Sequence, residues 1–483
     1  MEDFSITQLF YLLATALFIL GIKRLGKVKT ARSGNALAAV GMLLAIVVTL
    51  VAPGAGIELD WKMIGIGVAL GGLVGAVMAK RVEMTGMPEL VALLNGFGGL
   101  ASTFVALSEF WGRFAGAEVA GVAADQSEGL LLGGDVWVVA VVLSILIGTV
   151  TFTGSLVAMG KLSGKISGNP VILPGRHVIV AGLLIGSLVL GGMGGFSATG
   201  DTAVWMILGL AGCAAAFGVV SVLPIGGADM PVVVSLLNSY SGIAASMAGF
   251  VIGNPLLIVA GALVGAAGMI LTVIMCKAMN RSLGNVLVGG FGGEDTAVGG
   301  ASATDYTGVK SAGPEEAAMI LDAAGSVIFV PGYGMAVAQA QHVVKELGEE
   351  LESRDVTVRY AIHPVAGRMP GHMNVLLAES DVPYEQLWEL ERINGDFKTT
   401  DVVVIVGAND VVNPEAIENP QSPIAGMPIL NAHESGTVLM IKRSLSPGYA
   451  GIKNPLFERD NCYMCFGEGK AFLSDMLTAL KEG

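Results

Sequence analysis

Ser326–Gln341 reads SVIFVPGYGMAVAQAQ, which predicts a strand, a glycine turn and a helix in immediate succession. Ser326–Val330 is a short apolar run rich in β-branched residues, as in a buried strand. Gly332 and Gly334 suit a tight turn, because glycine adopts positive φ angles and has no Cβ that would block a ligand. The stretch therefore predicts a buried strand that leads into a tight glycine turn.

A helix is expected from Gly334 to Leu347, with one apolar face formed by Val337, Ala340, Val344 and Leu347. The free N–H groups and the dipole at the start of such a helix favour a pyrophosphate. The alternative is an ordinary tight turn between a strand and a helix, with no ligand.

Further elements are expected on both sides of this stretch. They are a helix at Pro314–Ala324, strands at Asp355–Ile362, Val402–Val406 and Val438–Lys442, a helix at Tyr384–Ile393, a short strand at Cys462–Phe466 and a helix at Lys470–Lys481. Because strands alternate with helices, we predict an α/β Rossmann-like domain with a doubly wound parallel sheet.

Ligands bind beyond the carboxyl ends of the strands in such a sheet. An NAD site would have an acid at the end of the second strand, about 20 residues after the glycines, but this strand ends in Ile362 and His363. Lys442, Arg443 and Ser444 offer two cations and a hydroxyl for a 2′-phosphate. The sequence therefore favours NADP over NAD. The alternative is that these residues only end a strand in solvent.

The chain before this domain has the composition of a membrane protein. Of its 483 residues, 53% are hydrophobic and 14% are charged, whereas a soluble protein has about 25% charged residues. The net charge of −13 argues against a nucleic-acid-binding protein. Nine apolar runs are long enough to cross a bilayer, at residues 6–22, 35–53, 61–79, 87–107, 136–159, 177–194, 203–223, 231–252 and 255–278.

Basic residues concentrate in the odd-numbered loops. They are Lys23, Arg24, Lys27, Lys29, Arg32, Lys80, Arg81, Lys161, Lys165 and Arg176, with Lys277 and Arg281 after the last span. The positive-inside rule then places the N-terminus outside and the C-terminal domain in the cytoplasm. We predict a transmembrane domain at 1–280, a flexible linker at 281–313 that includes the glycine-rich Gly289–Gly313, and the nucleotide-binding domain at 314–483.

Polar side chains within the spans are candidates for an ion path, because they are costly in hydrocarbon. Asn95 lies inside the fourth span, Asp229 precedes the eighth, and Asn238 lies within the eighth. Ser235 and Ser239 fit a simpler role as hydrogen-bond donors between helices. Asp229 would also fit an interfacial charge. No metal site is expected, because the pair Cys462 and Cys465 has no second pair to complete it.

Several long motifs resemble the β subunit of bacterial proton-translocating NAD(P) transhydrogenase. They are MPELVALLN (Met87–Asn95), GGADMPVVVSLLNSYSG (Gly226–Gly242), CKAMNRS (Cys276–Ser282), PGYGMAVAQAQ (Pro331–Gln341), HPVAGRMPGHMNVLLAE (His363–Glu379), GAND (Gly407–Asp410) and KRSLSPGYAG (Lys442–Gly451). Together they cover the spans and nearly the whole C-terminal domain.

The resemblance implies hydride transfer from NADH to NADP⁺, driven by inward proton movement across the bacterial cytoplasmic membrane. NADP(H) would bind this chain, and NAD(H) would bind a separate α subunit. A homodimer of the αβ unit is also implied. Asp410 would link protonation to the state of the nucleotide, while Asp229 and Asn238 match positions of the proton path.

The resemblance further assigns a set of residues to NADP(H) binding. They are Gly332, Tyr333, Gly334, Val365, Ala366, Gly367, Arg368, Met369, Pro370, Gly407, Ala408, Asn409, Asp410, Val411, Gly426, Met427, Lys442, Arg443, Ser444, Leu445, Ser446, Pro447, Gly448, Tyr449, Glu468 and Gly469. One position departs from the family pattern: many members have histidine where this chain has Asn95, which cannot titrate. A partner subunit, or water with Asp229, would then carry the proton.

Two other classes share parts of this pattern. One is an ion channel or carrier with a regulatory nucleotide-sensing domain, but a potassium filter needs a TVGYG-like loop between spans, and the only GYG here, Gly332–Gly334, lies in the C-terminal domain. The other is a structural membrane scaffold, but this class gives no role to the glycine turn or to the Lys442–Ser444 segment.

Overall fold

The computed structural model describes the chain except residues 1–5, 27, 52–58, 121–133, 169, 199, 227–228, 281, 289–305, 370 and 449. Lys27, Arg281, Pro370 and Tyr449 therefore lie outside the described residues, as does most of the segment expected to be the linker. The chain forms two compact units, one comprising Met1–Pro224 and Val233–Leu271, the other Ile225–Val232 and Thr272–Gly483.

Among the described residues, nine helices are long and apolar enough to cross a membrane. They are α1 (Ile6–Leu25), α2 (Val28–Val51), α3 (Trp61–Arg81), α4 (Met87–Ala120), α5 (Gly134–Leu162), α6 (Arg176–Gly192), α7 (Gly200–Val222), α8 (Met230–Val251) and α9 (Pro255–Ala278). Each overlaps one of the nine expected spans. Helix α4 continues well beyond the expected end at residue 107.

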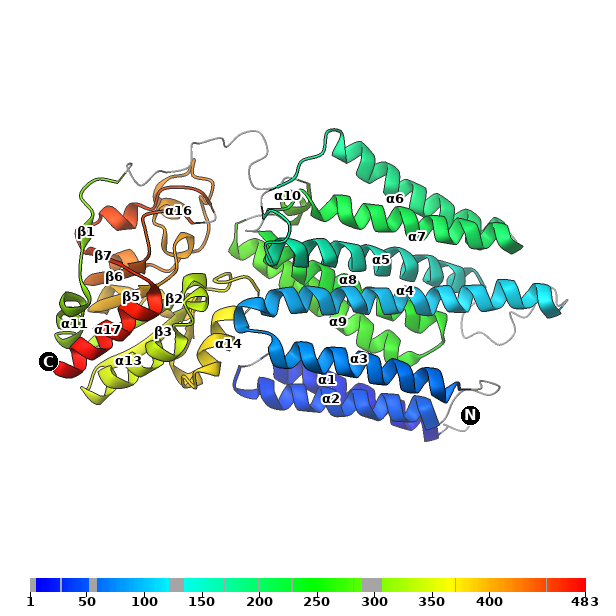
Figure 1. Ribbon diagram of the computed structural model, residues 1–483, viewed down its shortest axis with the longest axis horizontal. Helices are drawn as coiled ribbons and strands as arrows, with labels where there is room; N and C mark the ends of the chain where they lie inside the picture. Colours follow the sequence, from blue (N-terminus) through cyan, green and yellow to red (C-terminus); the bar gives the residue numbers. More distant parts are fainter. Residues whose placement is uncertain are drawn as a thin grey trace. The chain divides into compact units, whose positions relative to one another are not determined.

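Glycine allows close contact between neighbouring helices of this unit. Helices α4 and α5 run side by side (Figure 1), and a Cβ on either Gly99 or Gly148 would lie 2.5 Å from the carbonyl oxygen of the other. Helices α8 and α9 meet in the same way, because a Cβ on Gly242 would lie 2.8 Å from the carbonyl oxygen of Gly261. The high glycine content of the sequence thus serves backbone contact between helices.

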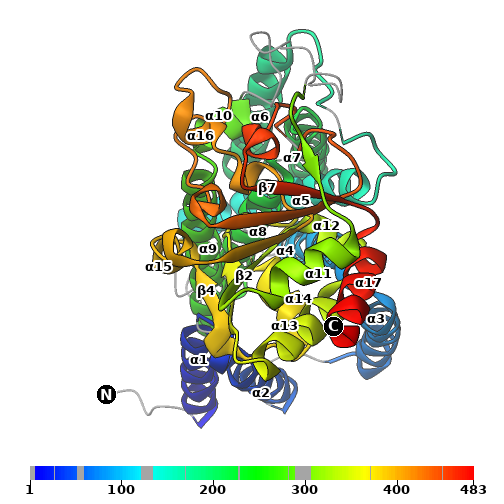
Figure 2. The same ribbon diagram turned by 90° about the vertical axis from the view of Figure 1, so that its left-hand side faces the viewer.

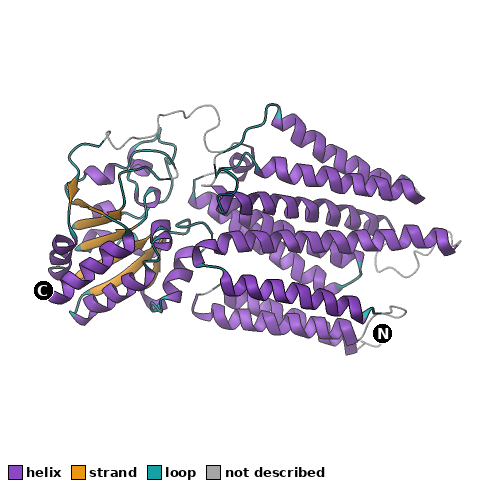
Figure 3. Cartoon of the chain, in the orientation of Figure 1, coloured by secondary structure: helices purple, strands orange, loops and turns teal. Residues whose placement is uncertain are grey.

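All the strands of the described residues lie in the other unit (Figure 3). They are β1 (Lys310–Ser311), β2 (Ser326–Pro331), β3 (Thr357–Ile362), β4 (Leu387–Glu389), β5 (Val402–Val406), β6 (Thr437–Lys442) and β7 (Cys462–Phe466). They form one sheet in the order β1-β7-β6-β5-β2-β3-β4, and every pair is parallel. This confirms the doubly wound parallel sheet.

Helices and short turns cover the two faces of this sheet. Helices α11 (Pro314–Asp322), α13 (Gln341–Ser353) and α17 (Gly469–Glu482) lie on one face (Figure 2). On the other face, Ile328, Ile405 and Met440 pack against Phe397, Phe457 and other buried residues of short segments. Alternate residues of each strand supply the two faces, as the pleat requires. The sheet is thereby buried on both sides.

Two expected helices differ from the structure. The helix expected from Gly334 to Leu347 is interrupted: α12 (Tyr333–Val337) and α13 are separate, and Gln339 between them has a φ of 50°. Val337 is consequently 47% exposed and does not share the buried face of α13. The helix expected at Tyr384–Ile393 is instead a 3-10 turn at Tyr384–Gln386, the edge strand β4 and the single turn α15 (Leu390–Ile393).

The expected linker also differs from the structure at both of its ends. Near its start, α10 (Leu283–Val288) is helical, and at its end β1 pairs with β7. The part of this segment after residue 305 therefore belongs to the sheet-containing unit. Lys310–Ser311 forms a strand because its backbone can pair with the otherwise free edge of β7.

Candidate functional site

The candidate site lies where the sheet order reverses, at the carboxyl ends of β2 and β5. Strand β2 pairs with β3 on one side and with β5 on the other, so the connections that follow β2 and β5 leave in opposite directions. In open α/β sheets this is the position at which ligands bind. The glycines of the two turns, Gly332 and Gly407, thus face the same crevice.

The two turns touch through their backbones. Gly332 N–H donates to Val406 O at 2.9 Å, and Gly334 N–H donates to Gly407 O at 2.9 Å. A Cβ on Gly332 would lie 2.5 Å from Ala408 Cα, and Gly407 has a φ of 66°. Glycine is required at these positions because any side chain would separate the turns or strain the backbone.

The start of α12 offers less to an anion than the sequence suggested. The N–H groups of Gly332 and Gly334 are taken by the contact between the turns, and Met335 N–H donates to Gly332 O at 3.0 Å. Helix α12 has only five residues, so its dipole is small compared with that of a full helix. The charge of any anionic ligand here would therefore be met largely by side chains.

The loop after β6 supplies such side chains. Lys442 Nζ donates to Ser446 O, and the hydroxyls of Ser444 and Ser446 lie 2.9 Å apart. Burial lowers the pKa of Lys442 to about 8, although the nearby Asp410 carboxylate acts in the opposite direction. A phosphate beside Lys442 would favour its charged form. The loop therefore has the groups that an anionic ligand needs.

Asp410 connects this loop to the turn after β5. Its Oδ2 accepts a hydrogen bond from Ala450 N–H at 3.0 Å. A Cβ on Gly448 would lie 2.6 Å from Asp410 Oδ2, so the loop backbone passes directly over the carboxylate. A change in the charge of Asp410 would therefore act on the loop that carries Lys442.

A third loop, after β3, closes the crevice on the opposite side. Arg368 stacks over the ring of Tyr333 at 4.3 Å, and its N–H donates to His372 Nδ1 at 3.0 Å. Gly367 has a φ of 109°, and a Cβ there would lie 2.6 Å from the His372 ring. These contacts hold the Val365–Arg368 backbone against the glycine turn that follows β2.

His363 stands where an NAD site would have an acid. Its ring is 2% exposed, with Nε2 2.8 Å from Pro428 O and Nδ1 accepting from Val365 N–H at 3.3 Å. Burial lowers the pKa of His363 to about 4, despite the hydrogen bond to Pro428. His363 is therefore neutral near pH 7 and connects the loop after β3 to the segment before β6.

Most of the residues assigned by resemblance line this one cleft. They are Gly332, Tyr333, Gly334, Val365, Ala366, Gly367, Arg368, Gly407, Ala408, Asn409, Asp410, Val411, Met427, Lys442, Arg443, Ser444, Ser446, Pro447, Gly448, Glu468 and Gly469. Met369, Gly426 and Leu445 are not among the lining residues, and Pro370 and Tyr449 lie outside the described part. Glu468 also caps α17, accepting from Ala471 N–H at 2.8 Å.

Sequence reasoning missed several lining residues, most of them apolar. They include Val337, Ala338, Val406, Pro423, Ile424, Ile441, Ala450 and Gly467. Val406 and Ile441 are the last or next-to-last residues of β5 and β6, so the strand-end rule could have found them. Pro423 and Ile424 come from an irregular segment, for which the sequence carries no such signal.

The polar residues of the spans have defined neighbours. Asn95 is buried in α4 and donates from Nδ2 to Val234 O of α8 at 3.3 Å, one turn before Asn238. Ser235 and Ser239 donate to the α9 carbonyls of Gly268 and Gly265, at 3.3 and 2.6 Å. The helix-pairing role expected for the two serines is confirmed.

Asp229 and the two cysteines of β7 are buried. Asp229 is fully buried just before α8, so its carboxyl group does not face solvent. Cys462 and Cys465 are both free, and burial raises the pKa of each thiol to about 12. Their spacing of three along β7 directs them to opposite faces of the sheet.

Comparison with known proteins gives one family. The family model of the NAD(P) transhydrogenase beta subunit matches residues 7–479. The chain is 47% identical over 476 residues to the NAD(P) transhydrogenase subunit beta of Rhodospirillum rubrum, with 99% of each chain covered. A second sequence from a strain of that species gives the same values.

Proposed function

The chain belongs to the family of NAD(P) transhydrogenase beta subunits and is a multi-pass membrane protein, and from this premise we propose that its C-terminal cleft binds NADP(H). The observation that carries the proposal is the contact of Gly332 and Gly334 with Gly407 at the reversal of the sheet order, facing the loop of Lys442 and Ser444. A dinucleotide needs close backbone approach at the turns and cations at its phosphates.

The residues of the cleft fit such a group. Gly332, Gly334 and Gly407 let the backbones of the two turns meet at the cleft, where a Cβ would separate them, while Lys442, Arg443 and Ser444 suit a 2′-phosphate. The backbone of Val365–Arg368 would lie along the nicotinamide side. When bound, NADP(H) supplies the hydride chemistry, and this chain contributes position and charge.

The activity we propose is hydride transfer between NADH and NADP⁺ coupled to inward proton movement. NAD(H) would bind an α subunit, and the assembly would be a homodimer of αβ units in the bacterial cytoplasmic membrane. The N-terminus would lie outside and the C-terminal domain in the cytoplasm. No acid or base is needed for the hydride itself, because the chemistry depends on placing the two nicotinamides in contact.

Proton movement would use the polar residues of the spans and Asp410. Asn95 and Asn238 come from contacting helices, α4 and α8, and Asp229 is buried just before α8. Asn95 can hold a water by its amide but cannot release a proton. Titration along this path would therefore fall to Asp229 or to a group of the partner subunit.

The direct test is binding of NADPH to the full chain purified in detergent, measured by the change in NADPH fluorescence. We expect NADPH to bind and NADH to bind at least about 100-fold more weakly, because the cations near the 2′-phosphate act only on NADPH. Arg443→Ala and Lys442→Ala should each weaken NADPH binding by about 10- to 100-fold.

Lys398→Ala is the matched control, because Lys398 is exposed and pairs with Glu434 away from the cleft. It should bind NADPH like the wild type. Equal affinity of the wild type for NADH and NADPH, or full NADPH affinity in the Lys442 and Arg443 variants, would contradict the assignment of this cleft. Addition of an α subunit should then allow reduction of an NAD analogue by NADPH.

A further inference from the structure

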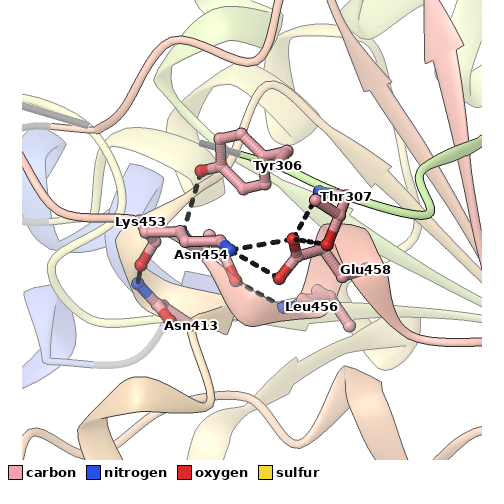
Figure 4. Close-up of polar contacts among 7 residues, drawn as sticks. All are labelled: Tyr306, Thr307, Asn413, Lys453, Asn454, Leu456 and Glu458. Carbon is pink, nitrogen blue, oxygen red and sulfur yellow. Dashed lines mark hydrogen bonds and ion pairs between the residues drawn. The ribbon is translucent and has the colours of Figure 1, made fainter. Parts of the chain in front are cut away.

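The sheet-containing unit has a polar cluster that the cleft does not explain. It joins Tyr306 and Thr307, the first described residues after the segment 289–305, to the segment Lys453–Glu458 (Figure 4). Asn454 N–H donates to Tyr306 Oη at 3.0 Å, and the Tyr306 ring stacks on Phe457 with centroids 5.5 Å apart. Lys453 Nζ lies 5.2 Å from the same ring.

The backbone at Tyr306 and Thr307, which we call the entry segment, is held in place without the tyrosine hydroxyl. Thr307 N–H donates to Glu458 Oε1 at 2.7 Å, and Glu458 is also paired with Lys453 at 2.8 Å. Three residues after Thr307, at Lys310, β1 begins its pairing with β7. The hydroxyl contact of Tyr306 is therefore not needed merely to attach the chain.

Asn454 is the junction between this segment and the cleft. It is fully buried, and each of its polar groups bonds in a different direction. The backbone N–H reaches Tyr306, Oδ1 accepts from Leu456 N–H at 3.0 Å, and Nδ2 donates to Asn409 Oδ1 at 2.8 Å and to Asn409 O at 3.3 Å.

Asn409 belongs to the turn after β5 and directly precedes Asp410. Asp410 in turn accepts from Ala450 N–H in the loop that carries Lys442. Hydrogen bonds thus connect Tyr306 through Asn454 to Asn409, and the next residue in the chain, Asp410, connects this turn to the loop that carries Lys442. A buried polar network of this kind holds its members in one arrangement.

We propose that Asn454 and Tyr306 are positioning residues through which the end of the linker sets the geometry of the Gly407–Val411 turn and, with it, nucleotide affinity. The effect on the turn concerns the protein alone, whereas the effect on nucleotide affinity rests on the proposed function. The connection is reciprocal, so nucleotide in the cleft also orders the entry segment.

The first test is hydrogen–deuterium exchange on the full chain in detergent, without nucleotide. Tyr306→Phe removes the acceptor of Asn454 N–H and keeps the ring. Amides of residues 407–413 should exchange about tenfold faster, because a buried donor is left without its partner. Asn454→Ser retains a capping oxygen for Leu456 but loses its reach to Asn409, and should give a similar increase.

Two control variants separate this effect from a general loss of stability. Thr307→Val removes a neighbouring hydroxyl that faces Glu458, and Tyr384→Phe makes the same change at a tyrosine that is 40% exposed. Both should leave exchange at residues 407–413 unchanged. Unchanged exchange in Tyr306→Phe would overturn the proposal, as would an equal rise throughout β2 and β5.

The second test adds NADPH. In the wild type, NADPH should slow exchange at residues 306–311, whereas Asn454→Ser should bind NADPH more weakly and should lose this response even at saturating NADPH. Retention of the response in Asn454→Ser would overturn the proposed connection. A wild type that binds no NADPH would instead contradict the function proposed for the cleft, and it would leave the nucleotide-free comparison valid.

Discussion

At the residue scale, His363 shows how burial fixes a protonation state next to the cleft. Its ring is almost fully buried, and its two nitrogens contact Pro428 O and Val365 N–H. The pKa of His363 is lowered by burial to about 4, whereas an exposed histidine has a pKa of about 6.5. Between about pH 6.5 and pH 4, this histidine therefore binds a proton in the unfolded chain but not in the folded one.

We therefore expect the free energy of unfolding of this unit to fall as the pH drops below about 6.5, by up to about 1.4 kcal/mol per pH unit from His363 alone. His363→Gln should be less stable than the wild type at neutral pH by about 1–2 kcal/mol but should lose less on acidification. Pulse proteolysis of the full chain in urea at two pH values measures both effects.

The exposed His342 provides the control. His342→Gln should keep the acid sensitivity of the wild type. His433, whose pKa is also lowered by burial, remains in both variants and leaves a residual slope. If His363→Gln lost stability on acidification as steeply as the wild type, the neutral, buried state of His363 would be the wrong explanation.

At the scale of elements, the turns after β2 and β5 work as one unit because glycine lets them touch. Gly407→Ala would place a Cβ against the backbone of Gly334 in a residue with a φ of 66°. We expect a loss of about 2–4 kcal/mol in unfolding free energy, from the left-handed backbone and the steric overlap together. NADPH binding should fall in parallel, as measured by fluorescence titration.

Gly395→Ala is a matched control for this change. A Cβ on Gly395 would have no heavy atom within 4 Å, so the variant should keep the stability and NADPH affinity of the wild type. Normal NADPH affinity in Gly407→Ala would show that the two turns need not be in contact for binding.

The same elements show what the sequence could predict. Val402–Val406 and Cys462–Phe466 coincide with β5 and β7, because continuous apolar, β-branched or aromatic runs between turns specify buried strands. Candidate site residues were found because ligands meet parallel strands at their carboxyl ends. Gly332, Asp410 and Lys442 all follow or end a strand, and all line the cleft.

The errors have physical causes that a single sequence does not carry. Gln339 interrupts a run of good helix formers, so local propensity there predicts one helix and tertiary contacts produce two. Strand β4 has only three residues and gains its pairing from the free edge of β3. The network of Tyr306 and Asn454 joins residues 148 positions apart, a distance at which sequence pattern gives no signal.

At the scale of the whole molecule, a proton-driven enzyme of this family would need a group whose charge changes the affinity of the cleft for its nucleotide. Asp410 is suited to this role, because its carboxylate accepts from Ala450 N–H and lies near Lys442. Two arrangements of the Lys442 loop, with protonation of Asp410 favouring one of them, would couple nucleotide release to protons.

Asp410→Asn should remove this coupling while preserving an acceptor for Ala450 N–H. We expect the rate of NADPH release from the full chain to change less than about twofold from pH 6 to pH 8, whereas the wild type changes by about tenfold or more. Stopped-flow fluorescence measures the rates. Asp460→Asn, at an exposed carboxylate paired with Lys310, should release NADPH with the pH profile of the wild type. A wild-type profile in Asp410→Asn would place the coupling group elsewhere, with buried Asp229 the next residue to substitute.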